Sequence, residues 1–165
     1  MLLHLKERED IHQSEKVLNN MSVMNEIIFR FIKQQTCATI CCTDEKGIPY
    51  CFSCYYVIKP ESGLLYFKSS DNAYHTSRLA NNLAVAGTIL PDKLSKLITK
   101  GIQWRGELLD EHHPQTKDAD EIHHKKIPLA LVIKGKVFTI RLNIIKMTDS
   151  QLGFGKKNIW KRDEQ

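Results

Sequence analysis

The stretch that decides the fold reads Thr36-Cys-Ala-Thr-Ile-Cys-Cys-Thr43, then Asp44-Glu-Lys-Gly47, then Tyr50-Cys-Phe-Ser-Cys-Tyr-Tyr-Val-Ile58. The β-branched and aromatic residues of its first and last parts favour strands, and the polar residues between them favour a turn. A second turn at Lys59-Pro-Glu-Ser-Gly63 and a third strand over Leu64 to Lys68 follow. The sequence therefore predicts an antiparallel meander of three strands.

Further elements are expected on both sides of this meander. Residues 10–20 and 23–34 have helical periodicity, and Ser22 can cap the second helix. After the meander we expect a helix over Ala73 to Asn82, strands over Leu83 to Leu90 and Ile98 to Leu109, a helix over Pro114 to His124, and a strand over Val137 to Lys146. Six short strands with few crossover helices favour an α+β fold with a six-stranded antiparallel barrel over a doubly wound sheet.

Period-two alternation gives the last strand a predicted buried face. The residues expected on that face are Phe138, Ile140, Leu142 and Ile144. In the strand before it, Gly101 and Gly106 indicate bends or close approaches of the backbone.

Length and composition are those of one ordinary globular domain. The chain has 165 residues, of which 42% are hydrophobic and 26% charged, which argues against a disordered, collagen-like or membrane protein. We expect a single domain over residues 1–165, with residues 1–22 as a helical extension.

No apolar run approaches the roughly 18 residues that span a bilayer, and residues 1–8 mix charges into their apolar positions, unlike a signal peptide. The expected location is the cytoplasm.

Five cysteines, an odd number, lie between Cys37 and Cys54. In a cytoplasmic chain they are expected to be reduced and to pack as small core residues. A zinc site is not expected, because side chains three apart on a strand, such as those of Cys51 and Cys54, point to opposite faces. No metal ligand is therefore assigned.

The most informative block for function is Gly63 to Asn82, where a strand leads into a helix. Its polar and basic residues are Lys68, Ser69, Ser70, His75, Thr76 and Arg78. Hydroxyls and cations at the start of a helix suit a phosphate dianion, and the 24 Lys and Arg against 19 Asp and Glu favour an anionic partner. From the residues alone, a capped surface helix with solvated charges is the favoured explanation, because capping sequences of this kind are common.

Four segments, in order, resemble the FMN-binding split barrels of the pyridoxamine 5'-phosphate oxidase family. The segments are Gly47 to Val57, Gly63 to Asn82, Lys100-Gly-Ile-Gln-Trp-Arg-Gly106, and Ile145 to Asp149 with Gly153-Phe-Gly-Lys-Lys157. The resemblance runs from about Ile27 to Arg162 and is closest to an uncharacterised branch. It implies a split barrel that binds FMN as a homodimer.

The resemblance also implies roles for individual residues. Phe67, Lys68, Ser69 and Ser70 would border the flavin phosphate and ribityl chain, with His75 in the place of the usual lysine and Thr76 beside it. Phe52, Ser53, Cys54 and Tyr55 would present backbone groups to the isoalloxazine ring, and Gln103 would add a side-chain amide. From the C-terminal segment, Lys156, Lys157 and Trp160 would reach the cofactor of the other protomer.

The function expected from this resemblance is that of an FMN-dependent oxidoreductase acting on an unknown small molecule, with NAD(P)H as a candidate electron donor. No side chain is assigned a catalytic role, because the flavin carries the chemistry. The arginine and histidine pattern with which the true oxidases bind their vitamin B6 substrate does not occur here. The alternative is a non-catalytic protein that stores or senses flavin or haem on the same barrel.

Two other patterns bear on these alternatives. His112-His113 and His123-His124 suit haem or metal. On one helix, however, His113 and His124 would lie about 16 Å apart, which is too far to share one ion. Solvated surface histidines are therefore the preferred interpretation.

The basic and aromatic tail Lys156 to Arg162 is typical of nucleic-acid binding, or of an amphipathic end that packs Trp160 on the barrel. A net charge of +5 and the acidic Asp163 and Glu164 argue against nucleic acid.

Overall fold

The computed structural model describes residues 26–153 and 157–162 of the chain. The expected helix over residues 10–20, the cap at Ser22, the extension over residues 1–22 and the proposed cofactor contact of Lys156 lie outside the described residues. The second expected helix is observed over 26–34.

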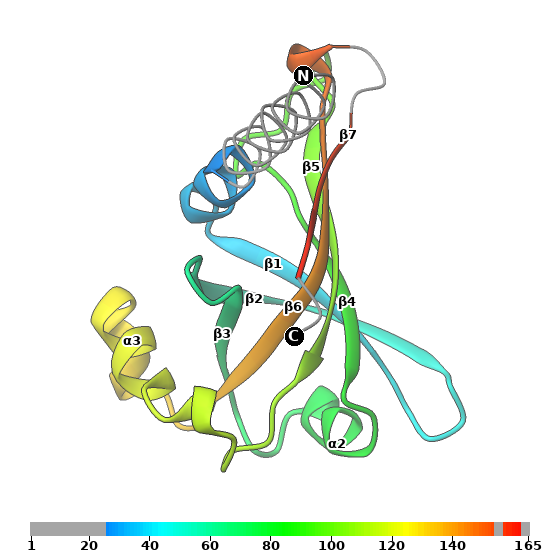
Figure 1. The fold of residues 1–165 in the computed structure, drawn as a ribbon. Coiled ribbons are helices and arrows are strands. Elements are labelled where there is room, and N and C mark those ends of the chain that lie inside the picture. Colours follow the sequence, from blue (N-terminus) through cyan, green and yellow to red (C-terminus); the bar gives the residue numbers. More distant parts are fainter. Residues whose placement is uncertain (1–25, 154–156, 163–165) are drawn as a thin grey trace, which may run out of the picture.

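A closed ring of antiparallel strands forms the body of the molecule (Figure 1). The strands are β1 (Cys37–Thr43), β2 (Pro49–Lys59), β3 (Leu64–Ser69), β4 (Ala84–Ile89), β5 (Lys100–Leu108), β6 (Lys136–Asp149) and β7 (Lys157–Lys161). Their order is β3-β2-β1-β4-β5-β6-β7, and an additional pairing between β3 and β6 closes the first six into a barrel. The predicted α+β split barrel of six strands is confirmed.

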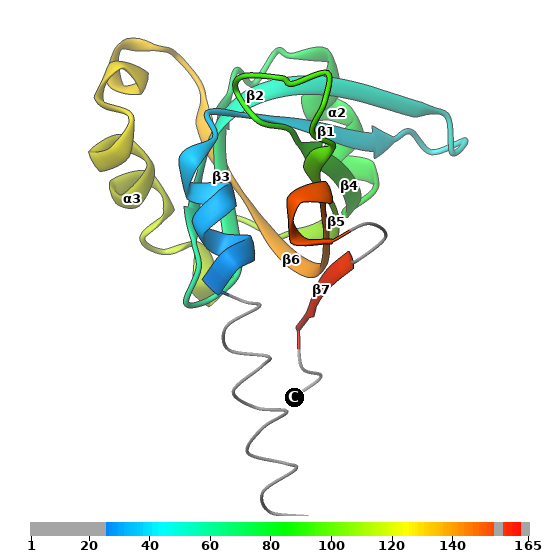
Figure 2. The same ribbon diagram turned by 90° about the horizontal axis from the view of Figure 1, so that it is seen from above.

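Short helices flank this barrel. Besides the helix over 26–34, they are α2 (Tyr74–Asn81), α3 (Ala119–Lys126) and the 3-10 helices η1 (Pro114–Thr116), η2 (Pro128–Val132) and η3 (Ser150–Leu152). Figure 2 shows α3 on one side of the barrel and the tip of the β1–β2 hairpin on the other. The α2 helix follows the predicted turn, but its N-cap is Ala73, which offers no side-chain cap.

The prediction of a single helix over Pro114 to His124 is wrong, because η1 ends at Thr116 and a separate helix, α3, begins at Ala119. The imidazole of His113 accepts a hydrogen bond from the backbone N–H of Gln115 at 3.1 Å, which caps the short turn. The apolar run that follows α3 forms η2, an element that the sequence did not predict.

The barrel interior is filled by side chains from every strand of the ring and from the helix over 26–34. The largest fully buried members of this cluster are Ile28, Ile32, Ile40, Leu65, Phe67, Leu79, Ile89, Ile102, Ile140 and Leu142. The helix is also held by a buried hydrogen bond of 2.6 Å, which the hydroxyl of Tyr56 donates to the carbonyl of Ile32. Removing the side chains of the helix that face the barrel would therefore open the core.

A β-bulge corrects the prediction for the last strand. Gly106 pairs with Leu142 and Arg105 with Ile144, so Asn143 is an extra residue on β6. The extra residue reverses the alternation, and Ile145 and Met147 are buried where Ile144 was expected. The predicted close approach at Gly106 is confirmed, because a Cβ on it would lie 2.4 Å from the carbonyl oxygen of Arg141.

The C-terminal strand β7 was not predicted and pairs with β6 over Ile144 to Thr148. The side chain of Trp160 on β7 packs against the core of the barrel and lies edge-on to Phe29, with ring centroids 5.5 Å apart. Of the two interpretations of the tail, the amphipathic end that packs Trp160 on the barrel is thus the one observed.

All five cysteines are free thiols in the structure. Their positions differ from the prediction, because Cys37 and Cys51 are exposed on the outer face of the sheet. Strand alternation places Cys42 and Cys54 on the inner face instead, where both contact the core.

Candidate functional site

A cavity of about 220 Å³ opens between the end of β3, the start of α2 and the η2 segment. It is lined by Phe52, Ser53, Cys54, Tyr55, Lys68, Ser69, His75, His123, Ile127, Ala130 and Ile133. Seven of these eleven residues were predicted as cofactor contacts, and they come from two segments, Phe52 to Tyr55 and Lys68 to His75. None of the described residues that line the cavity carries a carboxylate, so an anion would meet no like charge there.

An unpaired strand edge borders the cavity. The β3 strand pairs with β2 only over Tyr56 to Lys59, so in the described part of the chain the same edge of Phe52 to Tyr55 has no strand partner. Backbone N–H and C=O groups at such an edge are available to a ligand or to another chain. The resemblance to the split-barrel family implies a flavin ring at backbone groups of this kind.

The polar side chains of the cavity form a connected group. The Nζ of Lys68 donates a hydrogen bond to the carbonyl of Ala130 at 2.7 Å and lies 3.1 Å from Nε2 of His124. Beside it, the Oγ of Ser69 lies 2.7 Å from Nε2 of His75. The imidazole of His75 stacks on Phe52, and its burial lowers the pKa of His75 below the ordinary value. The cavity therefore offers the amino group of Lys68, the hydroxyl of Ser69 and the imidazole of His75.

His123, which was predicted to be a solvated surface residue, lines the cavity. Its side chain is 2% exposed, and neither ring nitrogen has a hydrogen-bond partner. Burial, followed by the charges of His124 and Lys68, lowers the pKa of His123 to about 4. The spacing with Ala119, four residues earlier on α3 and also buried, could have indicated an inward face. A buried imidazole without a partner points to a ligand.

The cavity does not bring together every predicted residue. Phe67 is fully buried in the core against Phe138. Ser70 and Thr76 hold the turn before α2, where the hydroxyl of Thr76 donates to the carbonyl of Ser70 at 2.9 Å.

Gln103 is exposed on β5 and lies away from the cavity. Paired residues form a row across the outer face of the sheet, from Ser53 to Thr39, Thr88 and Gln103. Three strand spacings separate the ends of this row, which is about 14 Å. A ligand that starts at Ser53 and extends along the row would approach Gln103.

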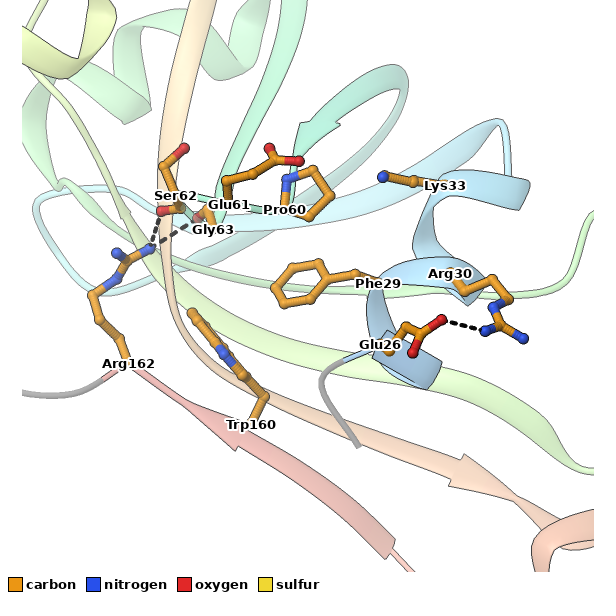
Figure 3. Close-up of a pocket in the computed structure, with 10 residues that line it drawn as sticks. All are labelled: Glu26, Phe29, Arg30, Lys33, Pro60, Glu61, Ser62, Gly63, Trp160 and Arg162. Atoms are coloured by element: carbon orange, nitrogen blue, oxygen red, sulfur yellow. Dashed lines mark hydrogen bonds and ion pairs between the residues drawn. The ribbon is translucent and has the colours of Figure 1, made fainter. Parts of the chain in front are cut away.

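Trp160 lines a different cavity, of about 540 Å³, with Phe29 and the β2–β3 turn (Figure 3). There the guanidinium of Arg162 donates to the carbonyls of Ser62 and Gly63 at 2.8 and 3.0 Å. These bonds fasten β7 to the turn. Within this chain Trp160 and the exposed Lys157 do not meet the residues around Lys68.

The described residues contain neither a cluster of metal ligands nor a membrane-spanning helix. No group of three or more histidine, cysteine, aspartate or glutamate residues among them could hold a metal ion. No helix in this part of the chain is both long enough and apolar enough to cross a membrane.

Solved structures share the fold at low sequence identity. A haem-binding protein from Mycobacterium smegmatis superposes with a TM-score of 0.65 at 15% identity over 79% of this chain, which spans 55% of that longer protein. An FAD-binding protein from Mesorhizobium loti superposes with a TM-score of 0.58 at 14% identity, over 73% of this chain and 91% of that one. Both likenesses agree with the split barrel expected from the sequence.

Sequence comparison identifies a nearer relative, although no family model matches the chain. A UPF0306 protein from Photorhabdus laumondii is 31% identical over 137 residues, which is 83% of this chain and 95% of the relative. The match extends over nearly the whole relative. The chain therefore belongs to the UPF0306 family.

Proposed function

We propose that the cavity beside Lys68 binds the phosphate end of FMN and that the chain is a flavin-dependent oxidoreductase acting on a small molecule. One observation carries this proposal. The side chains of Lys68, Ser69 and His75 converge with the unpartnered, buried His123 in a cavity without carboxylates. A cation, a hydroxyl and imidazole donors are what a phosphate requires.

The size of the cavity also supports binding of the phosphate end of FMN. At about 220 Å³ the cavity is smaller than the 300–1,000 Å³ typical of sites that enclose a whole ligand, so it suits a phosphate and the start of the ribityl chain. The ring system would extend along the unpaired edge of Phe52 to Tyr55. Bound flavin would supply hydride or electron transfer, while the protein orients it and shields the phosphate.

A homodimer is part of this proposal. The η2 segment and the residue after it expose apolar side chains beside the cavity, with Leu129, Leu131, Val132 and Ile133 between 59% and 85% exposed. Apolar groups gathered in this way mark an interaction surface. A partner protomer that covers them would also close over the ring system of the flavin.

The fold neighbours support a cofactor of this size. One is named as an FAD-binding protein and another as a haem-binding protein. Haem is the second candidate, because the neutral imidazole of His123 is a suitable iron ligand. In that case the protein would store or sense the group without catalysis.

The test is a visible absorbance spectrum of the protein purified in the dark, followed by titration with FMN. We expect flavin that co-elutes with the protein and at least a tenfold loss of affinity in Lys68→Met and Ser69→Ala, with His112→Gln as an exposed control. Retained flavin would justify a search for NADH or NADPH oxidation. Absence of binding in the titration would overturn the proposal, and a Soret band lost in His123→Ala would favour haem.

The dimer has its own test. Analytical ultracentrifugation of the wild type and of Val132→Glu should show a dimer and a monomer, respectively. A wild type that sediments as a monomer with FMN bound would remove the homodimer from the proposal and leave the phosphate site standing.

A further inference from the structure

Two cysteines on the outer face of the sheet lie directly opposite each other on neighbouring strands. Cys41 of β1 and Cys51 of β2 are partners in the antiparallel register. Strand alternation turns both side chains to the outer face, where Cys51 is exposed and Cys41 is half-buried. This pair lies outside the cavity and has no part in the proposed function.

The hydrogen bonds of the hairpin give the spacing of the pair. The backbone N–H of Asp44 donates to the carbonyl of Ile48 at 3.1 Å, so those two residues form a hydrogen-bonded pair. Such pairs alternate along the ladder with non-hydrogen-bonded pairs. The next pair, Thr43 with Pro49, is therefore non-hydrogen-bonded, and so is the pair two positions further on, Cys41 with Cys51. Proline, which has no N–H, fits this assignment.

This spacing is one that a disulfide can bridge. Opposed Cα atoms of a non-hydrogen-bonded pair are about 4.5 Å apart, and disulfides join Cα atoms roughly 4.4 to 6.8 Å apart. The two thiols already interact, since the contact with Cys51, and secondarily burial, raise the pKa of Cys41 to about 11. Closing the bond therefore needs no change of register.

The pair also occupies a distinctive place in the sheet. The β4 strand pairs with β1 over Thr39 to Cys41, so Cys41 is the last residue of β1 held by strands on both sides. Beyond it the β1–β2 hairpin projects from the barrel, as Figure 1 shows. A covalent link here would clamp the hairpin at the point where it leaves the sheet.

We propose that Cys41 and Cys51 form a redox-active dithiol, which a low-molecular-weight disulfide such as glutathione disulfide converts reversibly into an intramolecular disulfide. The thiolate of the more exposed Cys51 attacks one glutathione sulfur, which forms a mixed disulfide and releases one glutathione thiolate. Cys41 then loses its proton and attacks the sulfur of Cys51, which releases the second glutathione. Two cysteine thiols are oxidised and one glutathione disulfide is reduced to two thiols.

The other cysteines do not offer an equivalent pair. Cys37 is exposed on the outer face opposite Tyr55, whereas its neighbour across the strands, Cys54, points inward. Cys42 is buried, and its thiol donates to the carbonyl of Tyr50 at 3.6 Å. Oxidation is therefore expected to select one bond among the five thiols.

The experiment incubates the full-length protein in glutathione buffers of increasing oxidised fraction, quenches with an alkylating reagent, and maps the peptides by fragment-ion mass spectrometry. The expected product is a disulfide between Cys41 and Cys51 within one chain, which reducing buffer removes. Cys41→Ser should instead accumulate a stable glutathione adduct on Cys51, at least tenfold above the wild type. Cys37→Ser is the matched control and should form the disulfide normally.

Two results would overturn the proposal. One is a wild type that accumulates mixed adducts on its exposed cysteines to the same level as Cys41→Ser. The other is a disulfide that appears only between chains, seen as a doubled mass on a non-reducing gel. Because both cysteines lie at the surface of the sheet, serine variants should fold, and circular dichroism spectra that match the wild type would verify this.

Discussion

The phenyl ring of Phe52 on β2 lies parallel to the imidazole of His75 on α2, with ring centroids 3.6 Å apart and planes inclined by 6°. This contact joins the unpaired edge of β2 to the helix that follows the polar turn. It also shields His75 from water, and that burial is the cause of its lowered pKa. The stacking therefore couples the shape of the cavity to the charge of one of its polar groups.

Replacing Phe52 with alanine should raise the pKa of His75 toward 6.5, because water would again solvate the protonated ring. NMR titration of the histidine side-chain signals measures this directly. The variant should also lose about 1–3 kcal/mol of unfolding free energy, since the ring is partly buried against the core. A Phe52→Leu variant, which keeps the apolar cover, is the control, and an unchanged His75 titration in Phe52→Ala would contradict the coupling.

His123 should make the stability of the protein depend on acid. Its pKa is about 4 in the folded state and about 6.5 when unfolded, so the unfolded chain binds more protons between these values. The free energy of unfolding should therefore fall as the pH drops from 6.5 to 4, by up to about 3 kcal/mol from this residue. Urea unfolding of His123→Gln over this range should show a shallower fall. The exposed His112→Gln is the control, and equal slopes in all three proteins would exclude the effect.

Lys68 should hold the η2 segment against the end of β3. Its ammonium group donates to the carbonyl of Ala130, and a partly buried charged hydrogen bond contributes about 1.5–3 kcal/mol. Lys68→Met should increase amide hydrogen exchange over Pro128 to Val132 and should raise the pKa of His123 by removing a nearby positive charge. The exposed Lys125 provides the control Lys125→Met. Unchanged exchange over η2 in the Lys68 variant would show that the segment is held by other contacts.

Gly87 should tolerate no side chain. A Cβ at this position on β4 would lie 2.1 Å from the carbonyl oxygen of Thr39 and 2.4 Å from the ring of Trp104. Because backbone is one of the obstacles, Gly87→Ala should cost about 3 kcal/mol or more of unfolding free energy. At Gly47, where φ is +78° but no atom lies within 4 Å, the same change should cost only about 1 kcal/mol. Similar melting temperatures for the two variants would contradict this close packing.

Arg162 should control whether β7 stays on the sheet. Its side chain donates to the carbonyls of Leu142, Ser62 and Gly63, so Arg162→Met should lower the unfolding free energy by about 1–3 kcal/mol. Release of β7 would expose Trp160, and in a Trp104→Phe background its fluorescence should shift to longer wavelength. Arg30→Met is the control, because Arg30 is exposed and pairs only with Glu26 among the described residues. A Trp160 spectrum that does not change would mean that apolar packing alone retains the strand.

The barrel was predictable because its strands obey local rules. Alternation in Tyr50 to Ile58 and the turn chemistry at Lys59 to Gly63 act over a few residues. The alternation failed at Asn143, since a bulge depends on how β6 pairs with a strand some forty positions earlier. β7 was missed for a similar reason, because its short run of mixed polarity is a strand only where β6 offers an open edge.

The candidate site was predictable in its parts but not in its assembly. Lys68, Ser69 and His75 lie close in sequence, and a strand followed by a helix brings them together. The approach of Ala130 and His123 depends on the path of the chain between β5 and β6, which no local pattern encodes. His123 was predicted to be a surface residue because the segment His123-His124-Lys125-Lys126 is strongly polar. In the structure His123 is buried and His124 is half-buried.

The closure of the ring through β3 and β6 leaves β7 outside it. The β6 strand pairs with β3 over Lys136 to Arg141 and with β7 over Ile144 to Thr148, so the two partners occupy separate halves of one edge. Under a pulling force applied at the C-terminus, β7 would unzip bond by bond while the ring stays closed. A force-extension curve should therefore show a small early release followed by one larger rupture of the barrel.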